Sequence, residues 1–214
     1  MNGAATSGWG RGTLLAATLL VASGCAIDMP KAEAEKVAAE SLPRPEWRVG
    51  DRWSFKRTTA TGTESVVTHM VVAATMEGYT VRTQGIVPEV TRRWTLDLHL
   101  VEETAADGTF MRYDPPALFF SWPFKPGDTW TQEYQYADGR NDGRYANTWK
   151  VGAGVEPIDT VAGRFYTLRV ERWGGPRRLE AYWYNPRIRY WVRVEDYLRG
   201  YQEELVEVRS WSGS

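Results

Sequence analysis

The sequence predicts an antiparallel all-β domain from residue 47 onward. Apolar and polar side chains alternate there, with Trp53 and Phe55 lying between Arg52, Ser54 and Lys56. Short segments of this kind follow one another closely, separated by turn signals such as Glu-Gly and Asp-Gly. No segment after residue 46 keeps a helical period. An alternation of period two indicates strands with one buried and one solvated face, which is typical of antiparallel sheets.

The turn signals divide this domain into successive strands. Glycine, proline, asparagine and aspartate interrupt the alternation at positions where the chain is expected to reverse. Their close spacing favours hairpin connections between consecutive strands. The expected strands are 52–56, 65–76, 79–84, 94–100, 109–113, 130–136, 145–151, 165–173, 179–184, 190–194 and 204–208.

The composition excludes several classes of protein. The 214 residues are 43% apolar and 25% charged, with a formal net charge of −1. Disorder over most of the chain is excluded, because it requires low hydrophobicity and high net charge. One cysteine cannot form an internal disulfide, and one cysteine with two histidines is too few for a Cys/His zinc site. A near-neutral chain lacks the basic footprint of nucleic-acid binding, so no nucleic-acid partner, metal or cofactor is expected.

Cys25 ends a segment that is organised like a secretory signal. Arg11 is the only charged residue in positions 1–24, and an apolar run over 13–22 follows it. Small residues then precede Cys25 directly. A basic start, an apolar stretch of roughly 7–15 residues and small residues before a cleavage point describe such a signal. The run is too short to span about 30 Å of hydrocarbon as a permanent helix.

The segment Ala22-Ser23-Gly24-Cys25 resembles the lipobox of bacterial lipoproteins. The resemblance implies that Cys25 receives a diacylglyceryl group and becomes an acylated N-terminus, with palmitate as an expected acyl chain. Family members most often have Leu where this chain has Ala22. Ala26 follows the cysteine, whereas inner-membrane lipoproteins usually carry Asp there, so the resemblance implies an outer-membrane anchor and a periplasm-facing domain. The alternative is an ordinary free thiol after an ordinary signal.

The chain is therefore expected to have three parts. Residues 1–24 form the lipoprotein signal peptide, and residues 25–46 form a lipidated tether. The tether has helix-favouring residues but too few large apolar side chains to bury a face, which predicts a short helix or a flexible spacer. Residues 47–214 form a single β domain of ordinary size.

No local motif indicates catalysis, so the chain is not expected to be an enzyme. The sequence lacks the Gly-x-Ser-x-Gly, phosphate-loop and His-Glu-x-x-His patterns. His69 and His99 are isolated in strand-like segments, where they are expected to be solvated or hydrogen-bonded strand residues. An enzyme would need a polar cluster assembled from distant strands, which a local motif does not reveal.

The aromatic residues account for 13% of the chain and include 11 tryptophans. Because aromatic side chains favour strands and bury large areas, most of them are expected to build the core. One alternative is a curved sheet that leaves part of its aromatic face open to an acyl chain or another apolar ligand. Another is an exposed aromatic platform that stacks on sugars. The candidate ligand-binding residues are Trp94, Trp130, Tyr134, Trp149, Trp183 and Trp191.

Several segments resemble an uncharacterised family of bacterial envelope proteins. They are Val161-Ala-Gly-Arg-Phe165, Tyr182-Trp-Tyr-Asn-Pro186, Trp191-Val-Arg-Val-Glu195, Glu204-Leu-Val206 and, near the front of the domain, Val49-Gly-Asp-Arg-Trp53. The family turn often has Gly after the proline, where this chain has Arg187. Such families are similar in architecture to the half-barrel lipoprotein carriers and receptors of the LolA and LolB type. That similarity implies a curved sheet around an apolar cavity and transfers no activity.

These observations predict a strongly curved antiparallel sheet, as a half-barrel or open barrel, with or without a short N-terminal helix. The predicted function is that of a membrane-anchored, non-catalytic envelope lipoprotein that binds an apolar or lipid-linked ligand on the aromatic-lined sheet. The alternatives are a structural or assembly module that docks another envelope protein and a protein that binds carbohydrate such as peptidoglycan. An open cavity would favour a ligand, and a sealed core would favour a scaffold.

Overall fold

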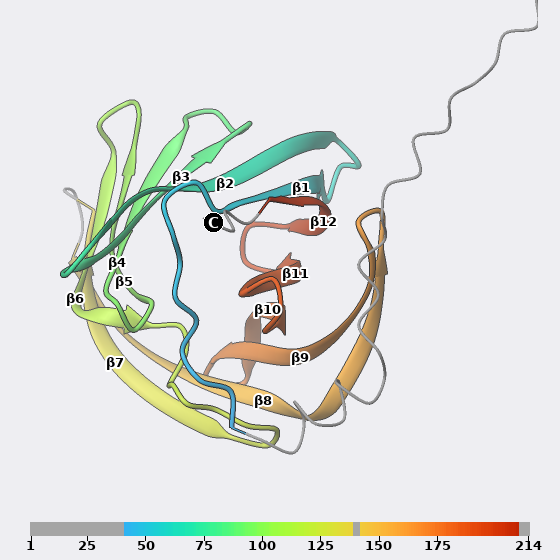
Figure 1. Ribbon diagram of the computed structural model, residues 1–214. Coiled ribbons are helices and arrows are strands. Elements are labelled where there is room, and N and C mark those ends of the chain that lie inside the picture. Colours follow the sequence, from blue (N-terminus) through green and yellow to red (C-terminus); the bar gives the residue numbers. More distant parts are fainter. Residues whose placement is uncertain (1–40, 139–141, 210–214) are drawn as a thin grey trace, which may run out of the picture.

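The computed structural model describes residues 41–138 and 142–209, which form one closed antiparallel β-barrel (Figure 1). Strands that follow one another in the chain are also neighbours in the barrel. The strands are β1 (Arg52–Thr59), β2 (Glu64–Thr75), β3 (Gly78–Gln84), β4 (Val90–Trp94), β5 (His99–Ala105), β6 (Phe110–Leu118), β7 (Thr129–Ala137), β8 (Asp142–Thr160), β9 (Gly163–Gly174), β10 (Arg177–Asn185), β11 (Tyr190–Asp196) and β12 (Tyr201–Arg209).

β1 closes the barrel because it has a partner on each side. Trp53 of β1 faces His69 of β2 and Val208 of β12. The chain is all-β and antiparallel, but the predicted half-barrel or open barrel is wrong. Residues alternate in the same way in an open and in a closed sheet, so the sequence pattern contains no information on the pairing of the first and last strands. Closure satisfies the backbone groups that the two edges of an open sheet would expose.

The described ranges contain no helix, and hence none with the length and hydropathy needed to cross a membrane. The predicted signal peptide, Cys25 and most of the predicted tether lie outside the described residues. The helix considered for the tether therefore stays a prediction. Residues 41–46, which are described, contain no helical turn.

A turn interrupts the strand that the sequence predicts over 94–100. β4 ends at Trp94 and β5 begins at His99, and Leu98 between them has a positive φ of 57°. The backbone N–H of Leu98 donates to the carbonyl of Thr95 at 3.0 Å. The sequence prediction failed because this turn contains neither Gly nor Pro, and its one turn residue, Asp97, falls on a polar position of the apolar alternation.

The segment before β1 fills one end of the barrel, called here the plugged end. Figure 1 shows this segment in blue, crossing the barrel. Trp47 is buried, and its ring lies 5.7 Å from that of Trp53 and 5.4 Å from that of Tyr79. Leu42 pairs with Phe124 in an isolated bridge, so the β6–β7 loop also lies at this end.

The core consists largely of aromatic rings, which is the expected role of aromatic residues in strands. Trp53 stacks on Tyr190 with ring centroids 4.1 Å apart, and such pairs contribute about 0.5–1.5 kcal/mol beyond the area they bury. The buried aromatic residues are Trp47, Trp53, Phe55, Tyr79, Trp94, Phe120, Phe124, Tyr134, Trp149, Phe165, Tyr182, Trp183, Tyr184, Tyr190 and Trp191.

The opposite end of the barrel is called here the mouth. Loops of an antiparallel meander lie alternately at its two ends. The β1–β2, β3–β4, β5–β6, β9–β10 and β11–β12 loops therefore lie at the mouth. Val87, Phe110 and Leu198, which lie in or directly beside these loops, are exposed.

Candidate ligand-binding cavity

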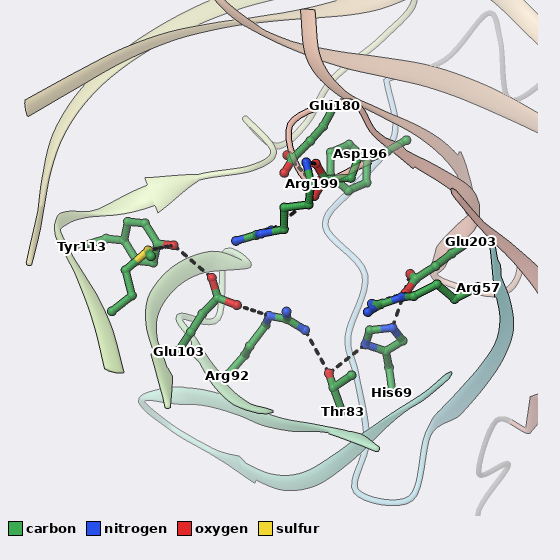
Figure 2. Close-up of polar contacts among 12 residues, drawn as sticks. Arg57, His69, Thr83, Arg92, Glu103, Tyr113, Glu180, Asp196, Arg199 and Glu203 are labelled. Atoms are coloured by element: carbon green, nitrogen blue, oxygen red, sulfur yellow. Dashed lines mark hydrogen bonds and ion pairs between the residues drawn. The ribbon is translucent and has the colours of Figure 1, made fainter. Parts of the chain in front are cut away.

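Charged side chains line the inside of the barrel between the plug and the mouth. They come from strands on opposite sides of the barrel and, in one case, from the β11–β12 loop. Figure 2 shows most of them in three groups around a shared space. The charged or titratable lining residues include Arg57, His69, Arg92, Glu103, Arg172, Glu180, Arg199 and Glu203.

The first group joins β1, β2 and β12. Arg57 Nη2 lies 2.5 Å from Glu203 Oε1, and His69 Nε2 lies 3.6 Å from Glu203 Oε2. Burial alone would raise the pKa of Glu203, but the nearby His69 ring and the charge of Arg57 outweigh burial and lower the pKa. Burial also lowers the pKa of His69. At neutral pH the carboxylate is therefore ionised and the imidazole is neutral.

Thr83 extends this group into a chain with the order of a catalytic triad. Thr83 Oγ1 lies 3.1 Å from His69 Nδ1, and Glu203 lies beside the other ring nitrogen. Arg92 Nη1 donates to the Thr83 hydroxyl oxygen at 2.9 Å. Thr83 is fully buried, however, and does not line either of the two cavities described below. Because a nucleophile must reach its substrate, this chain orients His69 and does not supply an attacking hydroxyl.

The second group joins β4, β5 and β6. Arg92 Nε donates to Glu103 Oε2 at 2.7 Å, and the Tyr113 hydroxyl donates to Glu103 Oε1 at 3.0 Å. Burial opposes ionisation of Glu103, but the charges of Arg92 and Arg199 prevail and lower its pKa. Burial and the nearby carboxylate raise the pKa of Tyr113, so its hydroxyl keeps its proton and remains a donor.

The third group joins β9, β10 and β11 with the β11–β12 loop. Arg172 Nε lies 2.9 Å from Glu180 Oε2, and the Tyr182 hydroxyl donates to the same oxygen at 2.5 Å. Burial raises the pKa of Glu180 in spite of the opposing charge of Arg172. Arg199 Nη1 lies 3.3 Å from Asp196 Oδ2, and about half of the Arg199 side chain is exposed. Figure 2 shows the Arg199 guanidinium extending into the shared space.

Two adjoining cavities occupy this space, and they share the wall residues Glu103, Phe119, Glu180 and Arg199. The inner chamber, toward the plug, has a volume of about 60 Å³. The outer chamber, toward the mouth, has a volume of about 250 Å³. Its other lining residues include Met111, Tyr113, Tyr134, Tyr136, Tyr145, Asn147, Arg172, Leu179 and Leu198.

The inner chamber fits water better than a ligand. A water needs roughly 10–15 Å³ of such volume and two to four polar partners, so about 60 Å³ holds only a few waters. Trp94 and Trp191 line this chamber, and their buried indole N–H groups have no acceptor within the described chain. Water in the chamber would satisfy such donors.

The six predicted ligand-binding residues do not form one site. Trp94 and Trp191 line the inner chamber, and Tyr134 lines the outer one. Trp130 and Trp149 stack on each other with centroids 6.2 Å apart, within or against the core.

Trp183 is buried, but its strand position is on the outer side of the sheet, because its neighbour Tyr182 faces inward and adjacent strand residues point to opposite faces. The guanidinium groups of Arg169 and Arg193 lie 5.5 and 5.8 Å from its ring. Ligand binding by these six residues stays a prediction. The predicted lipid attachment at Cys25 lies outside the described residues.

The charged lining of the barrel is not among the features that the sequence predicts. A usable signal existed in β4, where Arg92 lies two residues from Trp94 and therefore on the same buried face. A charged residue in phase with buried aromatics indicates either a paired internal charge or a cavity. Among the described residues, no group of three or more His, Cys, Asp or Glu side chains has the arrangement of a metal site.

No protein-family model matches the chain, and no curated protein matches it. Three solved structures are similar to it in part. The hypothetical lipoprotein YmcC from Escherichia coli K12 has a TM-score of 0.46 and 9% identity, covering 85% of this chain and 99% of that one. An exported-protein candidate with a YmcC-like fold from Bacteroides fragilis has a TM-score of 0.40 and 18% identity, covering 80% and 100%.

A lipoprotein candidate from Parabacteroides distasonis has a TM-score of 0.35 and 16% identity, covering 78% of this chain and 97% of that one. At these TM-scores the likeness carries no conclusion about the fold or the function of this chain.

Proposed function

We propose that this chain is a lipid-anchored protein of the bacterial cell envelope that binds a small ligand inside its barrel. The apolar run, the small residues before Cys25 and the following tether segment support the anchor. Ala26 after the cysteine supports an outer-membrane anchor with the domain in the periplasm. The tether would join the barrel at the plugged end, where Leu42 pairs with Phe124, and the mouth lies at the opposite end.

The outer chamber is the observation that supports a ligand. Binding pockets for drug-sized molecules have volumes of about 300–1,000 Å³, so a chamber of about 250 Å³ suits a small ligand or the head of a larger one. Tyr145 and Leu198 line the chamber and are exposed, so it opens to solvent at the mouth. Tyrosine rings, Met111 and Leu179 offer apolar contact, and an apolar or lipid-linked ligand would lie against them.

Binding is favoured over catalysis by the state of the polar groups. Glu103 accepts hydrogen bonds from Arg92 and Tyr113. Glu180 accepts one from Tyr182 and forms an ion pair with Arg172, and these contacts stabilise both side chains in fixed positions. A general acid or base must instead be within reach of the proton that it transfers and free to exchange it. We therefore propose a non-catalytic role.

Filling the outer chamber tests the proposal. Met111→Trp places a larger ring in the chamber and is expected to weaken ligand binding about tenfold. The full-length protein would be purified, its bound small molecules identified by native mass spectrometry, and its affinity for an apolar fluorescent dye measured. Met76→Trp is the matched control, because Met76 is 95% exposed and remote from the chamber. Absence of both bound molecules and dye binding would overturn the proposal.

A second candidate function is docking of another envelope protein at the mouth. Val87 and Leu198 lie in two mouth loops, Phe110 begins β6 directly after a third, and all three are exposed. A partner that covered them would remove this apolar surface from water. A photo-crosslinking residue at position 110 is expected to capture one stoichiometric partner in cells, whereas one at exposed Val161, at the β8–β9 turn, is not. Equal capture at both positions would reject docking at the mouth.

A further inference from the structure

Four charged residues on the wall of the outer chamber, Glu103, Arg172, Glu180 and Arg199, each have a partner of opposite charge, and Asp138 also lines this wall. Glu103 is bound to Arg92, and Glu180 is bound to Arg172, at 2.7 and 2.9 Å. Arg199 is bound to Asp196 in the same way, at 3.3 Å. A charged ligand would have to displace one of these partners or approach a like charge. The wall therefore favours a neutral ligand over an anion or a cation.

The chamber nevertheless offers both donors and acceptors of hydrogen bonds. Asn147 Nδ2 donates to the Tyr134 hydroxyl at 2.8 Å, so this hydroxyl keeps its own proton as a donor, and both residues line the chamber. Arg199 also lines the chamber, and about half of its side chain is exposed. A purely apolar chain in this chamber would leave such groups without partners, at a cost of about 1–3 kcal/mol each.

Tyrosine rings form the remaining wall. Tyr134 stacks near Tyr145 with centroids 6.1 Å apart, and Tyr136 lies 4.9 Å from Tyr145. Tyr113 meets Tyr134 edge-on at 5.6 Å. Tyr145 is 46% exposed, so part of its ring is free to contact a ligand that enters from the mouth.

We propose that the outer chamber binds an uncharged, polyhydroxylated ring, that is, a neutral saccharide unit. This inference rests on the proposed function, since it names the ligand of that same chamber. Sugar hydroxyls donate and accept hydrogen bonds, which matches the mixed groups of Tyr134, Asn147 and Arg199. The C–H face of the sugar ring would pack on the aromatic ring of Tyr145. The saccharide is either free or the head of a lipid-linked molecule, because the chamber opens at the mouth.

Titration of the full-length protein with defined ligands tests this inference. The probes are soluble peptidoglycan fragments, neutral hexose oligosaccharides, N-acetylhexosamine oligosaccharides and a fluorescent fatty acid, with binding followed by calorimetry and NMR. At least one saccharide is expected to bind, and Tyr145→Ala is expected to weaken it about tenfold. Tyr145→Phe keeps the ring and is expected to bind nearly as well as the parent.

Tyr197→Ala is the matched control, because Tyr197 also lies at the mouth and is partly exposed but does not line the outer chamber. It is expected to leave saccharide binding unchanged. If only the fatty acid bound, and bound in a Tyr145-dependent way, the saccharide inference would fall and the proposed ligand-binding function would stand. If no probe bound, both would fall. Equal loss in Tyr145→Ala and Tyr197→Ala would also reject the chamber as the saccharide site.

Discussion

Glu203 is a buried carboxylate whose ionised state is stabilised by two neighbours, Arg57 and His69. Its side chain is 3% exposed, and that of Arg57, which holds it, is 16% exposed. Burial favours the protonated acid, but His69 and Arg57 lower the pKa below its ordinary value of 4.5. Because the folded-state pKa is depressed, the group stabilises the fold above pH 4.5, and this contribution is lost as the pH falls below that value.

Removing the partner of Glu203 should expose this dependence. Arg57→Met leaves a buried carboxylate without its main counter-charge and is expected to reduce the free energy of unfolding by about 3 kcal/mol at pH 7. The loss should shrink below pH 4.5, because the variant can then protonate Glu203. Urea denaturation at pH 7 and at pH 4 measures this loss of unfolding free energy.

A surface pair provides the control for Arg57→Met. Arg144 pairs with Glu133, but the two side chains are 74% and 57% exposed, so Arg144→Met should change the free energy of unfolding by less than about 1 kcal/mol. A loss in Arg57→Met that stayed constant from pH 7 to pH 4 would show that packing, not charge, accounts for it.

The plug is the element that most clearly joins distant parts of the chain. The indole N–H of Trp47 donates to the carbonyl of Arg189 at 2.9 Å, across a separation of 142 residues. The Arg189 side chain lies 3.0 Å from Asp51 in the same N-terminal segment. Two elements that are remote in sequence therefore close the plugged end together, and Trp47 belongs to the folded core.

Truncating Trp47 should destabilise the barrel as a core mutation does. Trp47→Ala removes a ring that is 4% exposed and is expected to reduce the free energy of unfolding by about 3–5 kcal/mol. Val49→Ala is the control in the same segment, because Val49 is 53% exposed, and its effect should stay within about 0.5 kcal/mol. If chemical denaturation gave equal, small losses for both variants, the segment would not be part of the core.

The turn between β2 and β3 depends on a glycine. Gly78 has a φ of 145°, and a Cβ atom there would lie 1.9 Å from the Trp94 carbonyl oxygen of the adjacent turn. Gly78→Ala is therefore expected to reduce the free energy of unfolding by about 3 kcal/mol or more. Gly62→Ala also adds a side chain at positive φ, 80°, but into open space, and should cost only about 1 kcal/mol. Similar thermal unfolding of the two variants would contradict the close approach.

At the scale of the whole molecule, closure of the barrel brings the charged groups together. Arg57 and Glu203 meet because β1 pairs with β12, and in an open sheet these two strands would be its separate edges. The same closure makes β4 and β5 face β9 and β10 across the interior, so Glu103 and Glu180 line one chamber. An open half-barrel would place these residues on a solvated surface.

The predicted anchor is a property of the whole chain and is tested by fractionation. Cys25→Ala is expected to move the protein from the membrane to the soluble fraction, or to leave it unprocessed, and to abolish labelling with radioactive palmitate. Cys25→Ser should behave in the same way, because a hydroxyl does not form the thioether. Wild-type protein without a lipid label and with unchanged fractionation in both variants would reject the anchor.

The sequence by itself determined the local features of this protein: antiparallel strands from period-two alternation, most turn positions from Gly, Pro and Asp, and an aromatic core. It also supplied the signal that ends at Cys25, which the described residues do not test. These features depend on residues a few positions apart.

Only the tertiary structure decided that β1 pairs with β12 and that Trp47 plugs one end of the barrel. Those contacts join residues more than 140 positions apart, and alternation looks the same whether a sheet is open or closed. The charged cavity follows from closure, and the local pattern offered only one sign of it, Arg92 in phase with the buried Trp94.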